Sequence, residues 1–129
     1  MSELIFLSLD EVHAIHARSL AEHGGSAGIR DSGLIESALA SARNTFHYAN
    51  GGVFDVAASY AFHLAESQAF IDGNKRTGVV AAMVFLARNG VYAQPSRWEL
   101  YTAIIDVAEK KKTKADLAEI FRKCAEPEN

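Results

Sequence analysis

Cysteine is nearly absent from the sequence, which contains Cys124 alone. One cysteine forms neither an internal disulfide nor a cysteine-based metal cluster, and this usage fits a reducing compartment. Long apolar runs are also lacking, because the longest, residues 78–87, is about half of the roughly 20 residues that cross a bilayer. The start of the chain has no basic region before its short apolar patch, so it is not typical of a signal peptide. We therefore expect a soluble, cytoplasmic protein with no membrane partner.

An excess of positive charge is missing as well, since the formal net charge is −3. This balance argues against a general nucleic-acid or membrane-surface binder, so no direct nucleic-acid partner is expected. A local basic run of Lys110, Lys111, Lys112 and Lys114 is interpreted as a solvated junction between helices. The length of 129 residues lies near the commonest domain size, and 49% hydrophobic content is enough for one core. We expect residues 1–129 to form a single domain.

Repeats, low-complexity segments and convincing core strands are not found in the sequence, whereas helical periodicity is frequent. A capping box of Ser8 and Glu11 opens the first expected helix. Six helices are expected in chain order: residues 9–23; residues 34–42, with Asp31 or Ser32 as the cap; residues 56–67, capped by Asp55; residues 74–89; a fifth opened by Pro95 with Ser96 and Glu99, whose stripe includes Ile104, Ile105 and Ala108; and a sixth opened by Thr113 and Asp116, with Leu117, Ile120 and Phe121 facing inward. The predicted fold class is all-α.

The helix expected over residues 74–89 is apolar on every side for most of its length, which is typical of a helix buried in the middle of a bundle. Asn89 and Gly90 form its stop signal. Between residues 44 and 54 the helical period breaks, and Asn50-Gly51 favours a tight hairpin turn. The sequence thus predicts a compact bundle around a buried central helix, with a loop or small two-stranded flap over residues 44–54.

A short polar run, DGNKR, precedes this central helix. The N–H groups of residues 73–76 are donors that a helix N-terminus leaves without partners in the helix, so they attract anions. Phosphate suits this position, because Gly73 allows close approach while Lys75 and Arg76 supply positive charge. The Asn74 amide can donate to a bridging oxygen.

Asp72 would repel a bare phosphate. It becomes useful as a ligand of Mg²⁺, or as the acceptor of a proton from an attacking hydroxyl. An alternative stays open, in which Asp72 is an ordinary N-cap and Lys75 and Arg76 are simply solvated. Phe70 is expected to anchor the loop to the core.

The order of residues in QAFIDGNKR resembles the signature loop of the Fic/Doc family, which runs His, any residue, Phe, any residue, Asp or Glu, Gly or Ala, Asn, Gly or Lys, Arg. The stretch FLSLDEVHAIHARSLAEHGGSAGIRDSGLIESALA is similar to the opening of the Doc branch, and YAFHL and TGVVAAMVFLARNG continue the resemblance over nearly the whole chain. The resemblance implies a small all-helical domain that binds a nucleotide with Mg²⁺ and modifies a hydroxyl of a target protein.

Two chemistries occur in this family. The Fic branch transfers a nucleotidyl (AMP) group and carries a second arginine three residues after the first, where this chain has Val79. Lys75 after Asn74 is similar to the Doc branch, which acts as a kinase on elongation factor Tu and arrests translation. Doc members are toxins of toxin-antitoxin pairs. The resemblance therefore implies ATP and Mg²⁺ as cofactors, and a cognate antitoxin and elongation factor Tu as partners.

One position departs from the family pattern, since Gln68 stands where the catalytic histidine is expected. A glutamine amide does not take up a proton near neutral pH. His63 lies about 140° away around a helix, so it is not expected to replace that histidine. Three interpretations stay open: Gln68 orients the hydroxyl in a slow kinase that depends on Asp72 and Arg76, the domain is a catalytically silent binding module, or the glutamine was introduced to disarm a toxin. We favour the first.

Two histidines of the first helix, His13 and His16, have a spacing that can suit a metal. They have no matching second pair of ligands, so packing and surface roles are expected instead.

Overall fold

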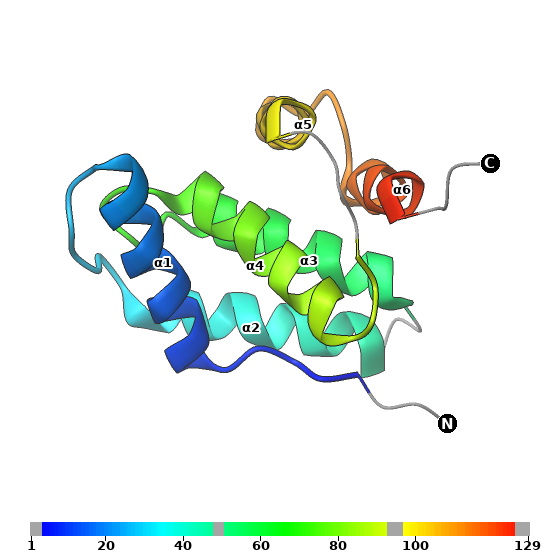
Figure 1. Ribbon diagram of the computed structural model, residues 1–129, viewed down its shortest axis with the longest axis horizontal. Coiled ribbons are helices and arrows are strands. Elements are labelled where there is room, and N and C mark those ends of the chain that lie inside the picture. Colours follow the sequence, from blue (N-terminus) through cyan, green and yellow to red (C-terminus); the bar gives the residue numbers. More distant parts are fainter. Residues whose placement is uncertain (1–3, 48–50, 93–96, 126–129) are drawn as a thin grey trace.

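A computed structural model describes residues 4–47, 51–92 and 97–125. In chain order the helices are α1 (Leu9–His23), α2 (Ser32–His47), α3 (Val53–Ser67), α4 (Asn74–Arg88), α5 (Arg97–Ala108) and α6 (Lys114–Ala125) (Figure 1). The described residues contain no β-strand, and one isolated antiparallel bridge joins Ile29 and Phe70. The all-α fold class is confirmed. Within these ranges, every helix is too short or too polar to cross a membrane.

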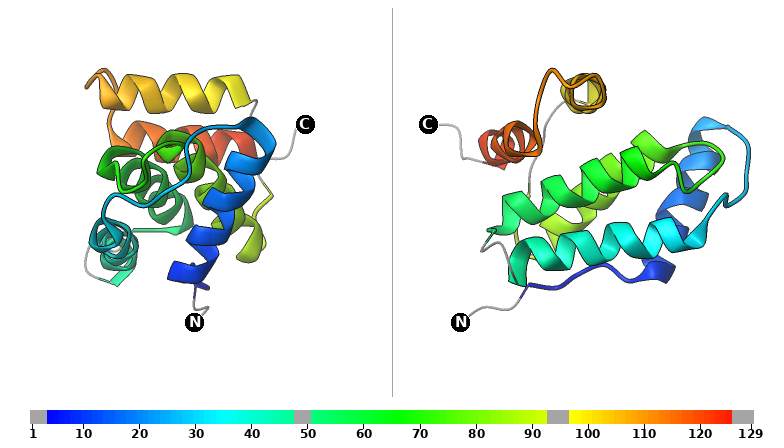
Figure 2. Two further views of the ribbon diagram at one scale, coloured as in Figure 1. Left: turned by 90° about the vertical axis from the view of Figure 1, so that its left-hand side faces the viewer. Right: turned by 180° about the vertical axis from the view of Figure 1, so that it is seen from behind.

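The helices pack in two groups around a shared core. α3 packs against both α2 and α4 and runs antiparallel to each, while α1 crosses one end of this group (Figure 1). α5 and α6 form an antiparallel pair on another side, with α6 against α3 (Figure 2). The residues that resemble the family signature, 68–76, run from the end of α3 into the first turn of α4 and are called the signature loop. This loop lies at the end of the bundle where α1 finishes. This arrangement brings the signature loop next to the segment that joins α1 to α2.

The centre of the bundle is shared by α3 and α4. Residues 56–61 of α3 are all buried, as are Leu64 and Ala65. α4 buries residues along most of its circumference, namely Thr77, Gly78, Val79, Ala81, Ala82, Phe85 and Leu86. Val80, however, is 38% exposed. The expectation that this helix is buried on every side is therefore wrong for the face that carries Val80.

α3 and α4 approach each other very closely at Gly78. A Cβ atom at this position would lie 2.6 Å from the carbonyl oxygen of Ala61 and 3.2 Å from the backbone nitrogen of Ala65. Backbone atoms in the middle of a packed helix cannot move aside as a flexible side chain can. Glycine therefore allows the start of α4 to lie against the end of α3, on the two sides of the signature loop.

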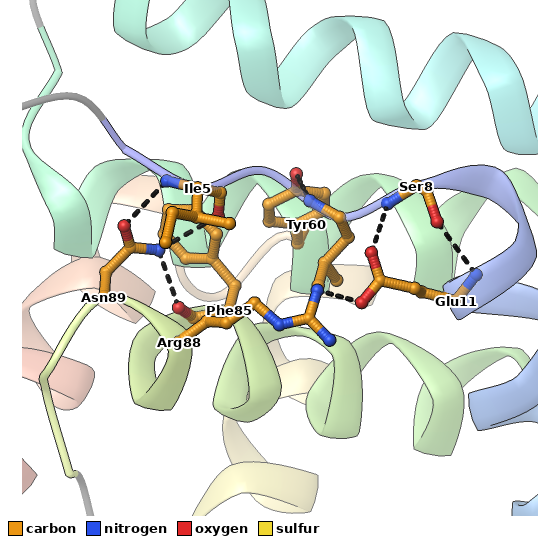
Figure 3. A network of polar contacts seen from close by, with 8 residues as sticks. Ile5, Ser8, Glu11, Tyr60, Phe85, Arg88 and Asn89 are labelled. Carbon is orange, nitrogen blue, oxygen red and sulfur yellow. Dashed lines mark hydrogen bonds and ion pairs between the residues drawn. The ribbon is translucent and has the colours of Figure 1, made fainter.

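The segment before α1 is fixed to α3 and α4 (Figure 3). The backbone N–H of Leu7 donates to the Tyr60 hydroxyl at 2.9 Å, and burial raises the pKa of Tyr60 above its ordinary value. The Asn89 side chain accepts from the N–H of Ile5 at 2.8 Å and donates to its carbonyl oxygen at 3.0 Å. Arg88 and Glu11 form an ion pair. These contacts hold the start of α1 on α4.

The boundary between α2 and α3 differs from the expected one. α2 continues to His47 and α3 begins at Val53. The prediction of a loop or flap over residues 44–54 is therefore wrong for residues 44–47 and 53–54, which are helical. Residues 48–50 lie outside the described residues. The last turn of α2 is stabilised by contacts that are distant in sequence, because Phe46 packs edge-on against Phe6 with ring centroids 5.8 Å apart. Asp55 is not the N-cap of α3; Gly52 is, and the Asp55 carboxylate accepts its N–H at 2.9 Å.

The remaining helix signals are mostly confirmed. α1 has the expected bounds and capping box, and Thr113 and Asp116 bond to each other at the start of α6. Gly90 follows α4 with a φ of 81°, as its stop signal requires. Pro95 and Ser96 lie outside the described residues. Ile104, Leu117 and Phe121 belong to the core and half-buried Ile120 packs against it, as expected. The predicted stripe of the fifth helix is wrong for Ile105, which is 44% exposed, and for Ala108, which is also exposed.

Candidate active site: the loop between α3 and α4

The signature loop borders an open cleft of about 340 Å³. Its lining consists of Ala65, Gln68, Ile71, Asp72, Gly73, Asn74, Lys75 and Arg76. The structure thus brings together every site residue expected from the sequence except Phe70, which lies beneath the loop. The Gln68, Asp72 and Lys75 side chains are exposed, and Arg76 is half-buried.

Left-handed backbone conformations bracket the loop. Gln68 ends α3 with φ 54° and ψ 33°, and Gly73 is the N-cap of α4 with φ 82°. The Asn74 side chain bonds the loop to itself, since its Oδ1 accepts the N–H of Phe70 and its Nδ2 donates to the Phe70 carbonyl, both at 3.0 Å. Asn74 therefore shapes the backbone of the loop, and its amide is already engaged in doing so.

Phe70 attaches the loop to the core and to the α1–α2 segment. Its side chain is 1% exposed. On either side of it, the N–H of Arg30 donates to the Ala69 carbonyl at 2.6 Å, and the N–H of Ile71 donates to the Gly28 carbonyl at 3.1 Å. The backbone of the signature loop is thus held by residues about 40 positions earlier in the chain.

Asp72 is held at the surface by two backbone donors. Its Oδ1 accepts the N–H of Gly73 at 3.0 Å, and its Oδ2 accepts the N–H of Ser26 at 3.2 Å. A Cβ at Gly25 would lie 2.9 Å from that Oδ2, so glycine leaves room for the carboxylate. The alternative in which Asp72 caps α4 is wrong, because Gly73 is the N-cap and no described side chain bonds to the first turn as a cap.

The N-terminus of α4 therefore faces the cleft with its first-turn N–H groups and with Lys75 and Arg76. The N–H of Gly73 is already engaged with Asp72, so the donors directed at a guest start at Asn74. Arg76 also borders a second hollow of about 380 Å³ between α1 and α4, where Val79 and Val84 form part of the wall. The site combines a helix N-terminus, two cationic side chains and one carboxylate.

His63 lies away from this cleft, as its position on the helix predicts. Its Nε2 is 3.1 Å from Nζ of Lys114 on α6, and the two side chains join α3 to α6. An ammonium group only donates, so this nitrogen of His63 accepts and the ring is neutral. Burial, together with the positive charge of Lys114, lowers the pKa of His63 from 6.5 to about 4. Residues 110–112 form the exposed junction expected from the basic run.

This contact predicts a pH dependence of stability. Unfolded His63 takes up a proton near its ordinary pKa of about 6.5, but folded His63 does so only near about 4. The contribution of neutral His63 to the free energy of unfolding is therefore fully present above about pH 6.5 and is lost as the pH falls toward about 4. Between about pH 7 and about pH 5, we expect the free energy of urea unfolding to fall more for the natural chain than for His63→Gln, which keeps an acceptor for Lys114. Equal falls in both proteins would contradict this account.

One residue near the site was not recognised in the sequence. Packing and surface roles are expected for His16; it does pack, but it also bonds to the carbonyl oxygen of Asp72. The available signal was a polar residue in the apolar stripe of the first helix, alongside Val12 and Leu20. The residues of the α1–α2 segment that hold the loop carried no separate signal.

The cleft suits only a metal ion that needs few protein ligands. Among the described residues, no group of three or more His, Cys, Asp or Glu side chains could hold an ion. Asp72 is the one carboxylate among the described residues that line the cleft. Mg²⁺ commonly binds one or two protein carboxylates and completes its shell with water and substrate phosphates. The donor set therefore fits Mg²⁺ that arrives with a nucleotide.

Comparison with known proteins agrees with these features. A family model described as "Fic/DOC family" matches residues 6–86, which is more than half of the chain and includes the whole signature loop. "Protein kinase doc" of Escherichia phage P1 is 34% identical over 86 residues, covering 66% of this chain and 68% of that protein. "Toxin Doc" of Mycolicibacterium smegmatis is 39% identical over 85 residues, covering 64% of this chain and 65% of that protein. On the family match and on the relative from phage P1, the chain belongs to the Fic/Doc family.

Proposed function

We propose that this chain is a Doc-like protein kinase. It transfers the γ-phosphoryl group of ATP to a hydroxyl of a translation factor such as elongation factor Tu, in the cytoplasm, and a cognate antitoxin holds it inactive. The names "Protein kinase doc" and "Toxin Doc" of its relatives support the reaction class and the toxin role. The observation that carries the proposal is the meeting of Asp72, Lys75 and Arg76 in one cleft at the N-terminus of α4.

Phosphate binding follows from the charges in that cleft. The positive end of α4, its first-turn N–H groups and the Lys75 ammonium favour the phosphates of a nucleotide. The Arg76 guanidinium can bind two phosphate oxygens at once. The backbone N–H of Asn74 contributes a donor, while the Asn74 side chain keeps the loop in shape. The N–H of Gly73 is engaged with Asp72, so Gly73 contributes the close approach that its missing side chain allows. Charge that develops in phosphoryl transfer is then stabilised where these groups converge.

Asp72 has the role of proton acceptor or Mg²⁺ ligand in this proposal. The hydroxyl oxygen bonds to the γ-phosphorus while the bond from that phosphorus to the β–γ bridging oxygen breaks, so ADP leaves. The hydroxyl proton passes to the Asp72 carboxylate, or through water to solvent. Bound Mg²⁺ would supply neutralisation of phosphate charge. Gln68 borders the same cleft, and its amide can orient the hydroxyl by a hydrogen bond.

Phosphoryl transfer is favoured over nucleotidyl transfer by Val79. This side chain is 6% exposed and lines the hollow between α1 and α4, where the adenylyl-transferring branch would have its second arginine. A second candidate, a catalytically silent binding module, is favoured by Gln68 alone, since the position of the base carries an amide. Binding of a nucleotide is compatible with both candidates, and turnover separates them.

The test uses ATP labelled at either the α- or the γ-phosphate, with elongation factor Tu as acceptor. We expect transfer of the γ label alone, and a loss of at least roughly 100-fold in Asp72→Ala. Asp10→Ala is the matched control, because Asp10 is an exposed carboxylate in the first turn of α1, and its rate should be unchanged. Transfer of the α label would show nucleotidyl transfer. No transfer of either label would favour the binding module.

A further inference from the structure

His16 makes two contacts with the signature loop from its buried side. Its ring lies parallel to the Phe70 ring, with centroids 3.7 Å apart and 11° between the planes. Its Nε2 lies 2.8 Å from the carbonyl oxygen of Asp72. The side chain is 6% exposed. A carbonyl oxygen only accepts, so Nε2 carries the proton and donates it to this bond.

The bond from His16 fixes the peptide unit between Asp72 and Gly73. The C=O and N–H of a trans peptide lie in one plane and point in opposite directions, so holding the carbonyl also aims the N–H. This N–H of Gly73 donates to Oδ1 of Asp72, and the positive φ of Gly73 then turns the chain into α4. The carboxylate so held accepts its second bond from Ser26. A continuous set of contacts therefore runs from His16 to the Asp72 carboxylate.

We propose that His16 is a positioning residue, which sets the direction of the Asp72 carboxylate without touching the substrate. The catalytic part of this inference rests on the proposed function, in which Asp72 acts on the attacking hydroxyl. A role in packing alone would depend on the ring against Phe70, whereas positioning depends on the donor at Nε2. Substitution can separate the ring from the donor.

Two variants make that separation. His16→Phe keeps a ring against Phe70 and removes the donor, while His16→Gln keeps a terminal N–H donor and removes the ring. In γ-phosphoryl transfer, we expect His16→Phe to lower kcat by roughly 10- to 100-fold with KM for ATP within about threefold. His16→Gln should keep kcat within about threefold, although it unfolds at a lower urea concentration. Losses of kcat that only follow the unfolded fraction in both variants would overturn the proposal.

Amide hydrogen exchange gives a readout that does not depend on turnover. Without nucleotide, the N–H groups of Gly73 and Ser26 should exchange roughly tenfold faster in His16→Phe than in the natural chain, and at a near-natural rate in His16→Gln. If the natural chain transfers no phosphoryl group but this exchange pattern appears, the proposed function fails while the positioning of Asp72 by His16 stands. Unchanged exchange at Gly73 and Ser26 in a folded His16→Phe would refute the positioning role.

Discussion

Replacing Gln68 by histidine is expected to raise the rate of γ-phosphoryl transfer by roughly 10²- to 10⁴-fold. This is the usual contribution of a positioned general base, and the Gln68 side chain cannot supply it because an amide does not take up a proton in the relevant pH range. A histidine titrates near about pH 6.5 in water, so the neutral imidazole is available to take the hydroxyl proton. The change adds a base to a cleft that Lys75 and Arg76, the proposed phosphate-binding side chains, already line.

The backbone at position 68 is compatible with this substitution. Gln68 has φ 54° and ψ 33°, a left-handed conformation in which histidine is found more often than most residues. The side chain is exposed and borders the cleft, so a ring of similar reach meets no packed core. We therefore expect the gain in rate without a large loss of stability.

The measurement is the rate of γ-label transfer as a function of pH. The Gln68→His variant should show a rate that rises with pH through roughly 6 to 7, as the imidazole loses its proton, and the natural chain should lack this rise. Glu66→His is the matched control, since it places a histidine at another exposed position near the end of α3, outside the cleft lining, and should not change the rate. If Gln68→His is no faster than the natural chain, residue 68 is not where the proton is removed.

Helix ends that depend on neighbouring residues could be predicted from the sequence. The reciprocal bonds of Ser8 with Glu11, and of Thr113 with Asp116, join residues three positions apart. Both partners therefore lie in one short segment of the sequence, and the local pattern predicts the bond. The end of α2 could not be predicted in this way. Its last turn is packed against Phe6, which lies 40 positions earlier, and no local pattern encodes such a contact.

The candidate site shows the same division. Spacing suggests that Asp72, Lys75 and Arg76 lie together, because they are consecutive or nearly so at the start of one helix, and the resemblance to the Fic/Doc signature gives the group a role. The same local reasoning left open whether Asp72 caps that helix, and the answer came from Gly73 and from the distant N–H of Ser26. His16, 56 positions before Asp72, could be connected to it only through the fold.

Phe70→Ala is expected to lower the free energy of unfolding by about 3–5 kcal/mol. The ring is 1% exposed and stacks on His16, so truncation removes buried apolar surface and leaves a cavity between α1 and the loop. Ile71→Ala is the control on the same loop. The Ile71 side chain is 51% exposed, and its truncation should change the free energy by no more than about 0.5 kcal/mol. Urea unfolding of the two variants gives the comparison.

The position of Phe70 gives this loss a consequence beyond stability. Its own N–H and carbonyl are bonded to Asn74, and its backbone neighbours are bonded to Arg30 and Gly28. The buried ring fixes the backbone that makes these hydrogen bonds. Without the ring the loop is held less firmly, so the rate of γ-phosphoryl transfer by the folded fraction of Phe70→Ala should also fall, by roughly 10-fold or more. Phe70→Leu, which refills part of the volume, should recover stability before it recovers rate, because His16 then has no flat ring to lie against. A folded Phe70→Ala with natural transfer per folded molecule would mean that the Asn74 bonds and the α1–α2 segment suffice to shape the loop.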